Sequence, residues 1–304
     1  MKKNLKKMIS YYKPYRGVFF ADMLFAIAAS AVALAIPLIA RYITSSIIYL
    51  EREEAVREIL RLGVIMAGLV AISCFCNFFI SNYGHVMGAK IEYDMRAEVF
   101  AHFQKLSFAF YDNQKVGALM ARITTDLFDI TELMHHGPEN IVISLIKICG
   151  AFVIMTYISP MLTAAAFALV PVMFVYAYFF NGRMKRAFRR NREKIADINS
   201  RIEDNLSGIR VVKSFANEEI ENEKFRQGNG GFLEAKKNSY FYMGGYHAGL
   251  SSFSLLITVA VLAAGGIFIS YGRIEVTDLI TFLLYINVLT EPIKTLIDFT
   301  EQFQ

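Results

Sequence analysis

The strongest constraint on this chain of 304 residues is a set of six long apolar stretches. These stretches cover residues 18–42, 59–83, 141–158, 161–180, 246–270 and 279–299. Each is long enough to cross a hydrocarbon core of about 30 Å as a helix. Open strands are excluded, because a sheet edge in lipid leaves backbone N–H and C=O groups unsatisfied. The sequence therefore predicts an all-α membrane protein with six long transmembrane helices.

The overall composition excludes most soluble enzymes. Hydrophobic residues make up 55% of the chain and charged residues 19%, against about 45–50% and 25% in a soluble domain. The three cysteines all lie in apolar stretches, which excludes a disulfide-stapled secreted scaffold. A secretory signal peptide within residues 1–40 is disfavoured, since this apolar run is too long and contains Asp22 and Pro37. The net charge of +5 is too mild to indicate nucleic acid as a partner.

The distribution of basic residues predicts the orientation in the membrane. Residues 1–16 hold six Lys and Arg without an acidic residue, and residues 181–245 hold fourteen more. The loops on the opposite side are short and poor in Lys and Arg. By the positive-inside rule, both termini are expected in the cytoplasm. The expected location is a bacterial-type plasma (inner) membrane. Residues 1–16 are interpreted as a basic amphipathic helix on the inner leaflet, with four residues toward lipid: Leu5, Met8, Ile9 and Tyr12.

The two long inside segments, residues 84–140 and 181–245, have the pattern of amphipathic helices rather than of loops. Three apolar stripes recur at near-helical spacing: Met87, Ile91, Met95, Val99, Phe103 and Leu106; Leu119, Ile123, Leu127, Ile130 and Met134; Ile195, Ile198, Ile202, Leu206, Ile209 and Val212. A continuous helix over residues 62–106 would be about 67 Å long. The spans are therefore expected to continue as helices into the cytoplasm and to pack on one another there.

Each inside segment has one break in this periodicity, at Ser107–Gly117 and near Ser214–Asn222. A plain helical hairpin needs only a few polar turn residues. These breaks instead carry aromatic residues that would expose apolar surface without a partner. The aromatic residues are Phe108, Phe110, Tyr111 and Phe215. We interpret the two breaks as docking tips.

Six spans, long inside helices and two tips together resemble the transmembrane domain of an ATP-binding-cassette (ABC) exporter, of the multidrug or lipid type (type IV fold, half-transporter). The resemblance covers essentially the whole chain and rests on five motifs in order: YYKPYR (Tyr11–Arg16), IPLIARYI (Ile36–Ile43), FAFYDNQKVGALMARITTD (Phe108–Asp126), EDNLSGIRVVKSFANEEIENEKF (Glu203–Phe225) and EPIKTL (Glu291–Leu296). One departure is that the acid often found after the family's first span is Thr44 or Ser45 here.

The resemblance implies an elbow helix over residues 1–16 and an ABC transporter type 1 transmembrane domain over residues 17–304, in a domain-swapped dimer. It also implies two coupling helices that seat in nucleotide-binding domains. The first comprises Phe110, Tyr111, Asp112, Asn113, Gln114, Lys115 and Val116; the second is centred on Ser214, Phe215, Ala216, Asn217, Glu218 and Glu219. The implied partners are a nucleotide-binding domain, a second transmembrane subunit that makes a homodimer, and membrane lipid, without nucleic acid.

The chain carries no catalytic motif of its own. It contains no Gly-Lys dipeptide, so the P-loop G-x-x-x-x-G-K-[ST] is impossible. No catalytic residue is therefore assigned, and ATP with Mg²⁺ is expected in a nucleotide-binding domain absent from this chain. Because the sequence stops at Gln304 within a helical pattern, we expect a chain cut to the membrane domain. A natural half-transporter subunit with a separate ATPase chain is the alternative.

Ionisable and polar residues at membrane depth are candidates for a substrate pathway, because burying them in lipid is expensive. We assign Asn287, Glu291 and Lys147 to it. Glu291 can alternatively pair with Lys294, and Lys147 with an acid on a neighbouring helix. Of the other polar residues, Asn77 is expected to join helices, and Asp22 to be only interfacial. His135-His136 has no ligand cluster beside it in the sequence, so no metal site is predicted.

The sequence thus predicts the membrane part of an exporter that moves amphipathic drugs, lipids or peptides by alternating access, coupled to ATP hydrolysis elsewhere. An ion channel or secondary transporter is the first alternative, but it would need a ladder of charges within the spans and would have little need for long inside helices. A non-transporting membrane scaffold is the second, and it would not need docking tips.

Overall fold

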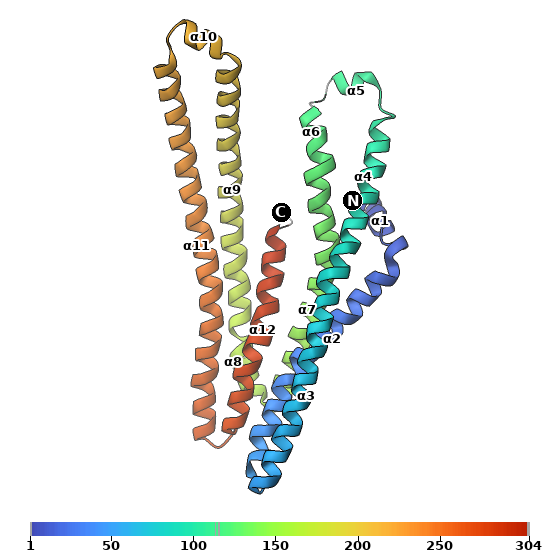
Figure 1. Ribbon diagram of the computed structural model, residues 1–304. Coiled ribbons are helices and arrows are strands. Elements are labelled where there is room, and N and C mark those ends of the chain that lie inside the picture. The colour runs from blue at the N-terminus through green and yellow to red at the C-terminus, as the bar shows by residue number, and fades with distance from the viewer. Residues whose placement is uncertain (1, 113, 115, 303–304) are drawn as a thin grey trace. The chain divides into compact units, whose positions relative to one another are not determined.

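A computed structural model describes residues 2–112, 114 and 116–302, and every regular element among them is helical. Within this described part, six helical stretches are long and apolar enough to cross a membrane. They lie in Lys6–Tyr49, Arg52–Phe103, Val116–Ile158, Pro160–Ser207, Glu218–Ser270 and Val276–Ile297. The all-helical class (Figure 1) and the six long apolar helices are therefore confirmed.

The chain divides into two compact units. Unit 1 comprises Met1–Thr163 and Val261–Phe303, and unit 2 comprises Ala164–Ala260. The chain passes from one unit to the other within two helices, α8 (Pro160–Phe167) and α11 (Glu218–Ser270). Each unit therefore contains part of both connecting helices.

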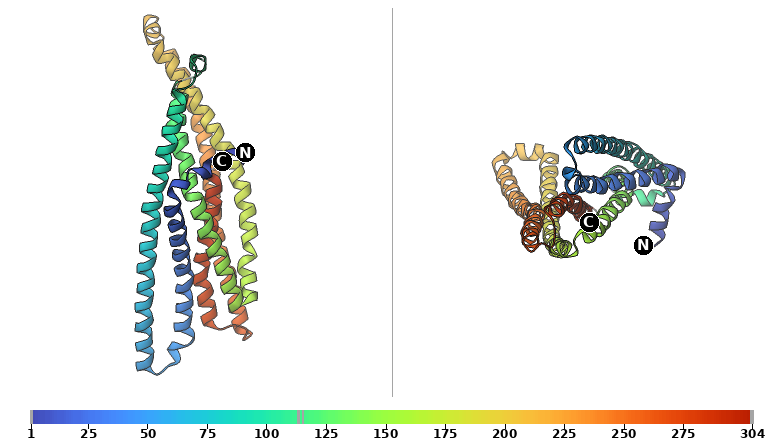
Figure 2. Two further views of the ribbon diagram at one scale, coloured as in Figure 1. Left: turned by 90° about the vertical axis from the view of Figure 1, so that its right-hand side faces the viewer. Right: turned by 90° about the horizontal axis from the view of Figure 1, so that it is seen from below.

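Unit 1 is built on four long helices that cover the same apolar stretches as the predicted spans. The helices are α2 (Arg16–Ser45), α3 (Arg52–Phe79), α7 (Leu127–Ile158) and α12 (Val276–Gln302). Helices α2 and α3 run antiparallel and are joined by the short 3₁₀ turn η2 (Ile47–Tyr49), as Figure 2 shows. Helix α7 packs against both α2 and α12. This places the centre of unit 1 along α7.

The spans of unit 1 continue as helices well past their apolar stretches, as predicted. Helix α3 passes through a π-helical turn, η3 (Ile80–Gly84), into α4 (His85–Phe103). These 52 helical residues extend over about 78 Å at 1.5 Å per residue. Ahead of α7, the chain runs through α6 (Val116–Ala121) and a second π-helical turn, η4 (Arg122–Asp126).

The first two predicted stripes pack against each other, because α4 and α7 lie side by side. Met87, Ile91 and Met95 of α4 are buried in one cluster with Leu127 and Met134 of α7. Burying apolar side chains in this way is the main stabilisation available to helices that have left the lipid.

The N-terminal helix α1 (Lys2–Ser10) differs from the prediction that the apolar side chains of residues 1–16 face lipid. Met8 and Tyr12, expected to face lipid, instead pack against the cluster between α4 and α7, and the Tyr12 hydroxyl donates to the Met134 carbonyl. Ile9 is exposed, and the Leu5 side chain lies outside the described part. The basic face of α1 is anchored too, since Lys7 Nζ lies 2.6 Å from Glu98 Oε1. Contacts with α4 and α7 thus hold the N-terminal helix in unit 1.

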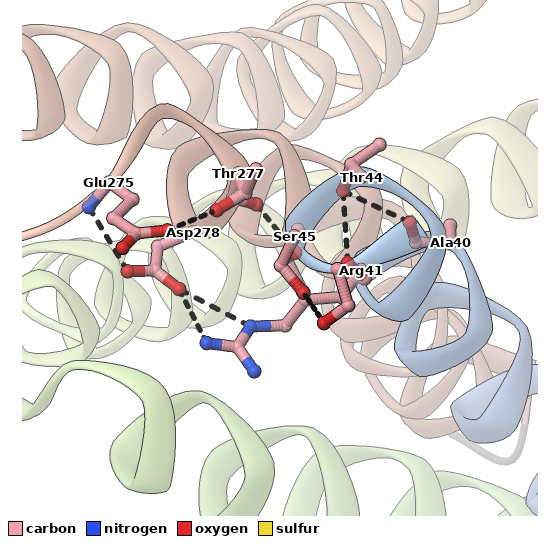
Figure 3. Close-up of polar contacts among 9 residues, drawn as sticks. Ala40, Arg41, Thr44, Ser45, Glu275, Thr277 and Asp278 are labelled. Atoms are coloured by element: carbon pink, nitrogen blue, oxygen red, sulfur yellow. Dashed lines mark hydrogen bonds and ion pairs between the residues drawn. The ribbon is translucent and has the colours of Figure 1, made fainter. Parts of the chain in front are cut away.

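At the opposite end of unit 1, a charged contact joins α2 to the start of α12 (Figure 3). The Arg41 guanidinium donates to Asp278 Oδ1 at 2.7 Å, and Asp278 Oδ2 accepts the Glu275 backbone N–H at 3.1 Å. One carboxylate therefore satisfies a helix N-terminus and pairs with Arg41. Just before it, Gly272 has φ +67°, the left-handed conformation that favours glycine in the turn between α11 and α12.

Unit 2 consists mainly of two long helices, α9 (Leu169–Ser207) and most of α11. Their chains approach closely at Gly245, whose carbonyl accepts the Tyr176 hydroxyl at 2.6 Å. Phe180 stacks on Tyr176, and a Cβ at Gly245 would meet the Phe180 ring. Helix α9 alone has 39 residues, or about 58 Å.

Candidate functional site: the two helical tips

The first predicted tip forms the short helix α5 (Phe108–Asp112), which caps the α4 and α6 pair (Figure 1). The Phe110 N–H donates to the Ser107 carbonyl at 3.0 Å and closes its first turn. The Tyr111 hydroxyl donates to the Phe103 carbonyl at 2.5 Å, which ties the tip to the end of α4. The Phe110 and Tyr111 rings meet edge to face.

This helix starts two residues before the coupling segment predicted at residues 110–116. Phe110, Tyr111 and Asp112 lie within α5, Gln114 lies in a bend, and Val116 begins α6. Asn113 and Lys115 lie outside the described residues. Phe108, in the first turn of α5, is 90% exposed. An aromatic side chain this open at the end of two long helices is a contact surface that a partner can cover.

The second predicted tip surrounds the short helix α10 (Ile209–Ser214), between α9 and α11. Ser214 is the last residue of α10, Phe215 and Ala216 form a turn, and Glu218 and Glu219 open α11. The described helix therefore precedes most of the predicted coupling residues. Its position follows from Gly208, which ends α9 with a non-helical backbone.

The turn of the second tip holds its aromatic residue outward. Phe215 is 72% exposed, and Ala216 next to it has φ +50°, a conformation that side-chain-bearing residues rarely adopt. Asn217, just before α11, is exposed as well. Glu218 and Glu219 lie in the first turn of α11, where the helix dipole favours negative charge. The tip therefore presents an apolar side chain beside acidic ones.

A cleft of about 950 Å³ lies beside α10, between the end of α9 and the start of α11. Apolar side chains line part of it: Leu206, Val211, Val212 and Phe225. Its polar edge is organised by Glu221, which accepts from Lys224 Nζ at 2.6 Å and from Asn205 Nδ2 at 3.1 Å. These bonds stabilise the carboxylate and hold the pKa of Glu221 below its usual value.

The predicted pathway residues lie close together in unit 1, on α7 and on one face of α12. Lys147 of α7 reaches α12, where its Nζ lies 3.0 Å from Glu291 Oε2. This is the alternative in which Lys147 pairs with an acid on a neighbouring helix. Asn287 is exposed on α12, one turn before Glu291. Asn77 Nδ2 donates to Ser73 Oγ within its own helix, α3, at 3.5 Å.

One cluster of ionisable residues was not predicted as a cluster, because the sequence analysis treated Asp22 and the His135-His136 pair separately. Asp22, expected at an interface, is fully buried, and it lies beside His135 and Glu139 of α7. His85 and His136 adjoin this group. The two fragments, Asp22 and the His pair, are more than 110 positions apart in the chain. Only the packing of α2 on α7 brings them together, and no local pattern encodes it.

Comparison with known proteins agrees with this architecture. The family described as ABC transporter transmembrane region matches residues 19–293. The chain is 36% identical over 289 residues to "Uncharacterized ABC transporter ATP-binding protein YwjA" of Bacillus subtilis, covering 95% of this chain and 50% of that protein. It is 26% identical to "Putative multidrug export ATP-binding/permease protein YgaD" of the same species, covering 97% and 51%.

A Staphylococcus aureus protein with the same multidrug export description as YgaD is 27% identical, covering 95% of this chain and 50% of its own length. The chain thus spans about half the length of the curated relatives it matches. The family match covers nearly all of the six spans and both tips. The chain belongs to the ABC transporter transmembrane family.

Proposed function

We propose that this chain is the transmembrane part of an ATP-driven exporter of amphipathic drugs, lipids or peptides. ATP and Mg²⁺ would bind to a nucleotide-binding domain, on the same protein or on a partner. The relatives named as multidrug export proteins support export of such cargo. The observation that carries the proposal is the pair of tips, each with an exposed aromatic side chain at the end of two long helices.

The mechanism follows from the stiffness of these helices. The 52 residues from α3 through η3 to the end of α4 are helical throughout, so a displacement at the tip reaches the span through one helical run. Two nucleotide-binding domains that close on ATP would move the tips toward each other and tilt the helices apart at the other end. This is alternating access by rigid-body motion. Because α4 and α7 are packed together below the first tip, they would move as one body.

The proposed assembly is a homodimer in which helices are exchanged between the two subunits. The two chains together enclose one pathway. Both termini would lie in the cytoplasm of a bacterial inner membrane. The residues proposed to line the pathway are Asn287, Glu291 and Lys147. The partner-facing coupling residues are those of the two tips, with Phe215 as the central contact of the second one.

The decisive experiment separates coupling from folding. Phe215→Ala and Tyr111→Asp are made in the protein together with its nucleotide-binding domain, in proteoliposomes. Transport of a panel of amphipathic dyes and fluorescent lipids is expected to fall at least about tenfold in each variant. Phe215→Ala removes an apolar contact with the partner, and Tyr111→Asp removes the hydrogen bond to the Phe103 carbonyl. Basal ATP hydrolysis is expected to persist.

Tyr157→Ala is the matched control, because this aromatic residue is also highly exposed, on α7, but lies far along the chain from either tip. It should leave transport and ATP hydrolysis unchanged. Normal transport and normal substrate-stimulated ATP hydrolysis in both tip variants would remove the coupling assignment.

A further inference from the structure

Three helical segments of unit 1 bring together five ionisable side chains, none of which belongs to a tip. Asp22 comes from α2, His85 from the start of α4, and His135, His136 and Glu139 from α7. The possible ligand atoms of Asp22, His135 and Glu139 all lie within 4.8 Å of one another, as do those of the three histidines. Asp22 is 0%, His135 3% and Glu139 8% exposed.

The buried polar atoms of this cluster are not satisfied by the protein. Both carboxylate oxygens of Asp22, both ring nitrogens of His135 and Oε2 of Glu139 are buried without a hydrogen-bond partner. Nearly all buried polar groups in proteins have a partner, and a buried charge is paired or coordinates a metal. Two carboxylates and an imidazole are directed into one small space, so the natural occupant is a cation.

The donor spacing fits a small divalent ion. Zn–N and Zn–O bonds of about 2.0–2.2 Å in a tetrahedron place neighbouring donor atoms about 3.4 Å apart. His135 Nε2 lies 3.7 Å from Glu139 Oε2, and His136 Nδ1 lies 3.6 Å from the same oxygen. Both separations are too long for a hydrogen bond, and the one between His135 and Glu139 is close to that of two ligands on one ion.

The chemistry of the donors selects the class of ion. Imidazole nitrogen suits Zn²⁺ and its transition-metal neighbours, whereas Mg²⁺ and Ca²⁺ prefer oxygen ligands throughout. Asp22 and Glu139 supply two negative charges, which a divalent ion balances. His85 contacts the cluster from outside, with its ring centroid 4.6 Å from that of His135.

The backbone is shaped to leave room at this point. Gly84, the last residue of the π-helical turn η3, faces the cluster, where a Cβ would lie 3.0 Å from Asp22 Oδ1 and 3.1 Å from His135 Nε2. Any other residue would push into the proposed ligands. Single π-helical turns are frequent at functional sites, and this one ends beside the cluster.

We propose that Asp22, His135 and Glu139 bind a divalent transition-metal ion of the Zn²⁺ class, with His136 beside this site rather than among its ligands. The ion joins α2 to α7 beside the η3 turn, where α3 passes into α4. It would hold α2 against α7 near the start of α4. Its ligands are different residues from those assigned to the export pathway and the tips, and the site does not depend on the proposed transport function.

Metal binding to the protein purified in detergent tests the site directly. After removal of bound metal with a chelator, one Co²⁺ per chain is expected, with the visible absorption bands of histidine-ligated Co²⁺, and Zn²⁺ but not Mg²⁺ should displace it. Asp22→Asn and Glu139→Gln keep the side-chain shape and remove the charge, and each should weaken binding at least about tenfold. His102→Gln is the matched control, since His102 is exposed on α4 outside the cluster.

A second measurement needs no variant. Zn²⁺, but not Mg²⁺, should raise the thermal unfolding midpoint of the unmodified protein in detergent, because the ion binds the folded state. Substoichiometric Co²⁺, unchanged affinity in folded Asp22→Asn and Glu139→Gln, or the same unfolding midpoint with and without Zn²⁺ would each overturn the site. If a variant does not fold, the stoichiometry and the thermal shift of the unmodified protein decide.

Discussion

At the scale of single residues, Gly84 and Gly88 offer a matched pair on neighbouring turns. A Cβ at Gly84 would press on the His135 ring and come within 3.0 Å of Asp22 Oδ1, whereas one at Gly88 would make only ordinary contact, 3.5 Å from His135 Cβ. Gly→Ala within a helix otherwise gains about 1 kcal/mol. We therefore expect Gly84→Ala to lower the thermal unfolding midpoint in detergent, and Gly88→Ala to maintain or raise it.

The same pair tests how crowded the cluster is. If Gly84→Ala melts at or above the unmodified protein, the space beside Asp22 and His135 is not constrained. Because both substitutions add one methyl group to the same helical run, a difference between them reports the neighbour and not the helix propensity.

Individual side chains show where prediction from sequence fails. Glu291 and Lys294 are neighbours on α12, so pairing between them was a natural alternative, yet Glu291 lies 3.0 Å from Lys147 of α7. Asp22 was placed at an interface because charge at the end of a span usually contacts water. Both outcomes depend on which helix packs against which, and local periodicity carries no information on that choice.

At the scale of helical elements, the α4–α7 pair is where sequence prediction worked best. The stripes of apolar residues at helical spacing correspond to buried residues on both helices. We expect Ile91→Ala, which truncates a fully buried residue of this cluster, to destabilise the pair by about 2–5 kcal/mol. Hydrogen exchange should speed up across residues 85–103 and 127–134.

Phe100→Ala is the appropriate control, because this larger side chain lies on the same helix but is exposed. It should leave the exchange rates of both segments unchanged. Equal acceleration by both variants would mean that the helical pair is not held together by its buried stripe.

The ends of elements were less predictable than their faces. Both tips were located to within a few residues, but α5 begins at Phe108 and α10 ends at Ser214. Their bounds depend on short-range backbone bonds, such as Phe110 N–H to the Ser107 carbonyl, which several registers of the same sequence can form. The elbow differs for another reason. Its amphipathic pattern specifies an apolar face without specifying whether lipid or protein covers it.

At the scale of the whole molecule, the basic residues are concentrated in the segments between the spans and are rare within the spans. Of 32 Lys and Arg, 25 lie in residues 1–16, 84–140 and 181–245, which form the elbow and the long helical pairs. The spans between them are nearly free of charge. This asymmetry is much larger than a random distribution would give, and it sets the side of the membrane on which the tips are expected.

The orientation can be measured with single cysteines. Cys74, Cys76 and Cys149 are first replaced by Ala, and one cysteine is then introduced at exposed Glu53, at the start of α3, or at exposed Glu219, in the second tip. In intact bacteria, a membrane-impermeant maleimide should label Glu53→Cys. It should label Glu219→Cys only after the cells are permeabilised, because the second tip would face the cytoplasm, where ATP is available.

Both variants should label fully in detergent, which controls for thiol reactivity. Labelling of Glu219→Cys in intact cells, with Glu53→Cys protected, would place the tips outside. It would then exclude a cytoplasmic ATPase as their partner, because coupling requires the tips, the nucleotide-binding domains and ATP to share one compartment. The positive-inside bias and the coupling assignment therefore stand or fall on the same measurement, although they rest on independent features of the chain.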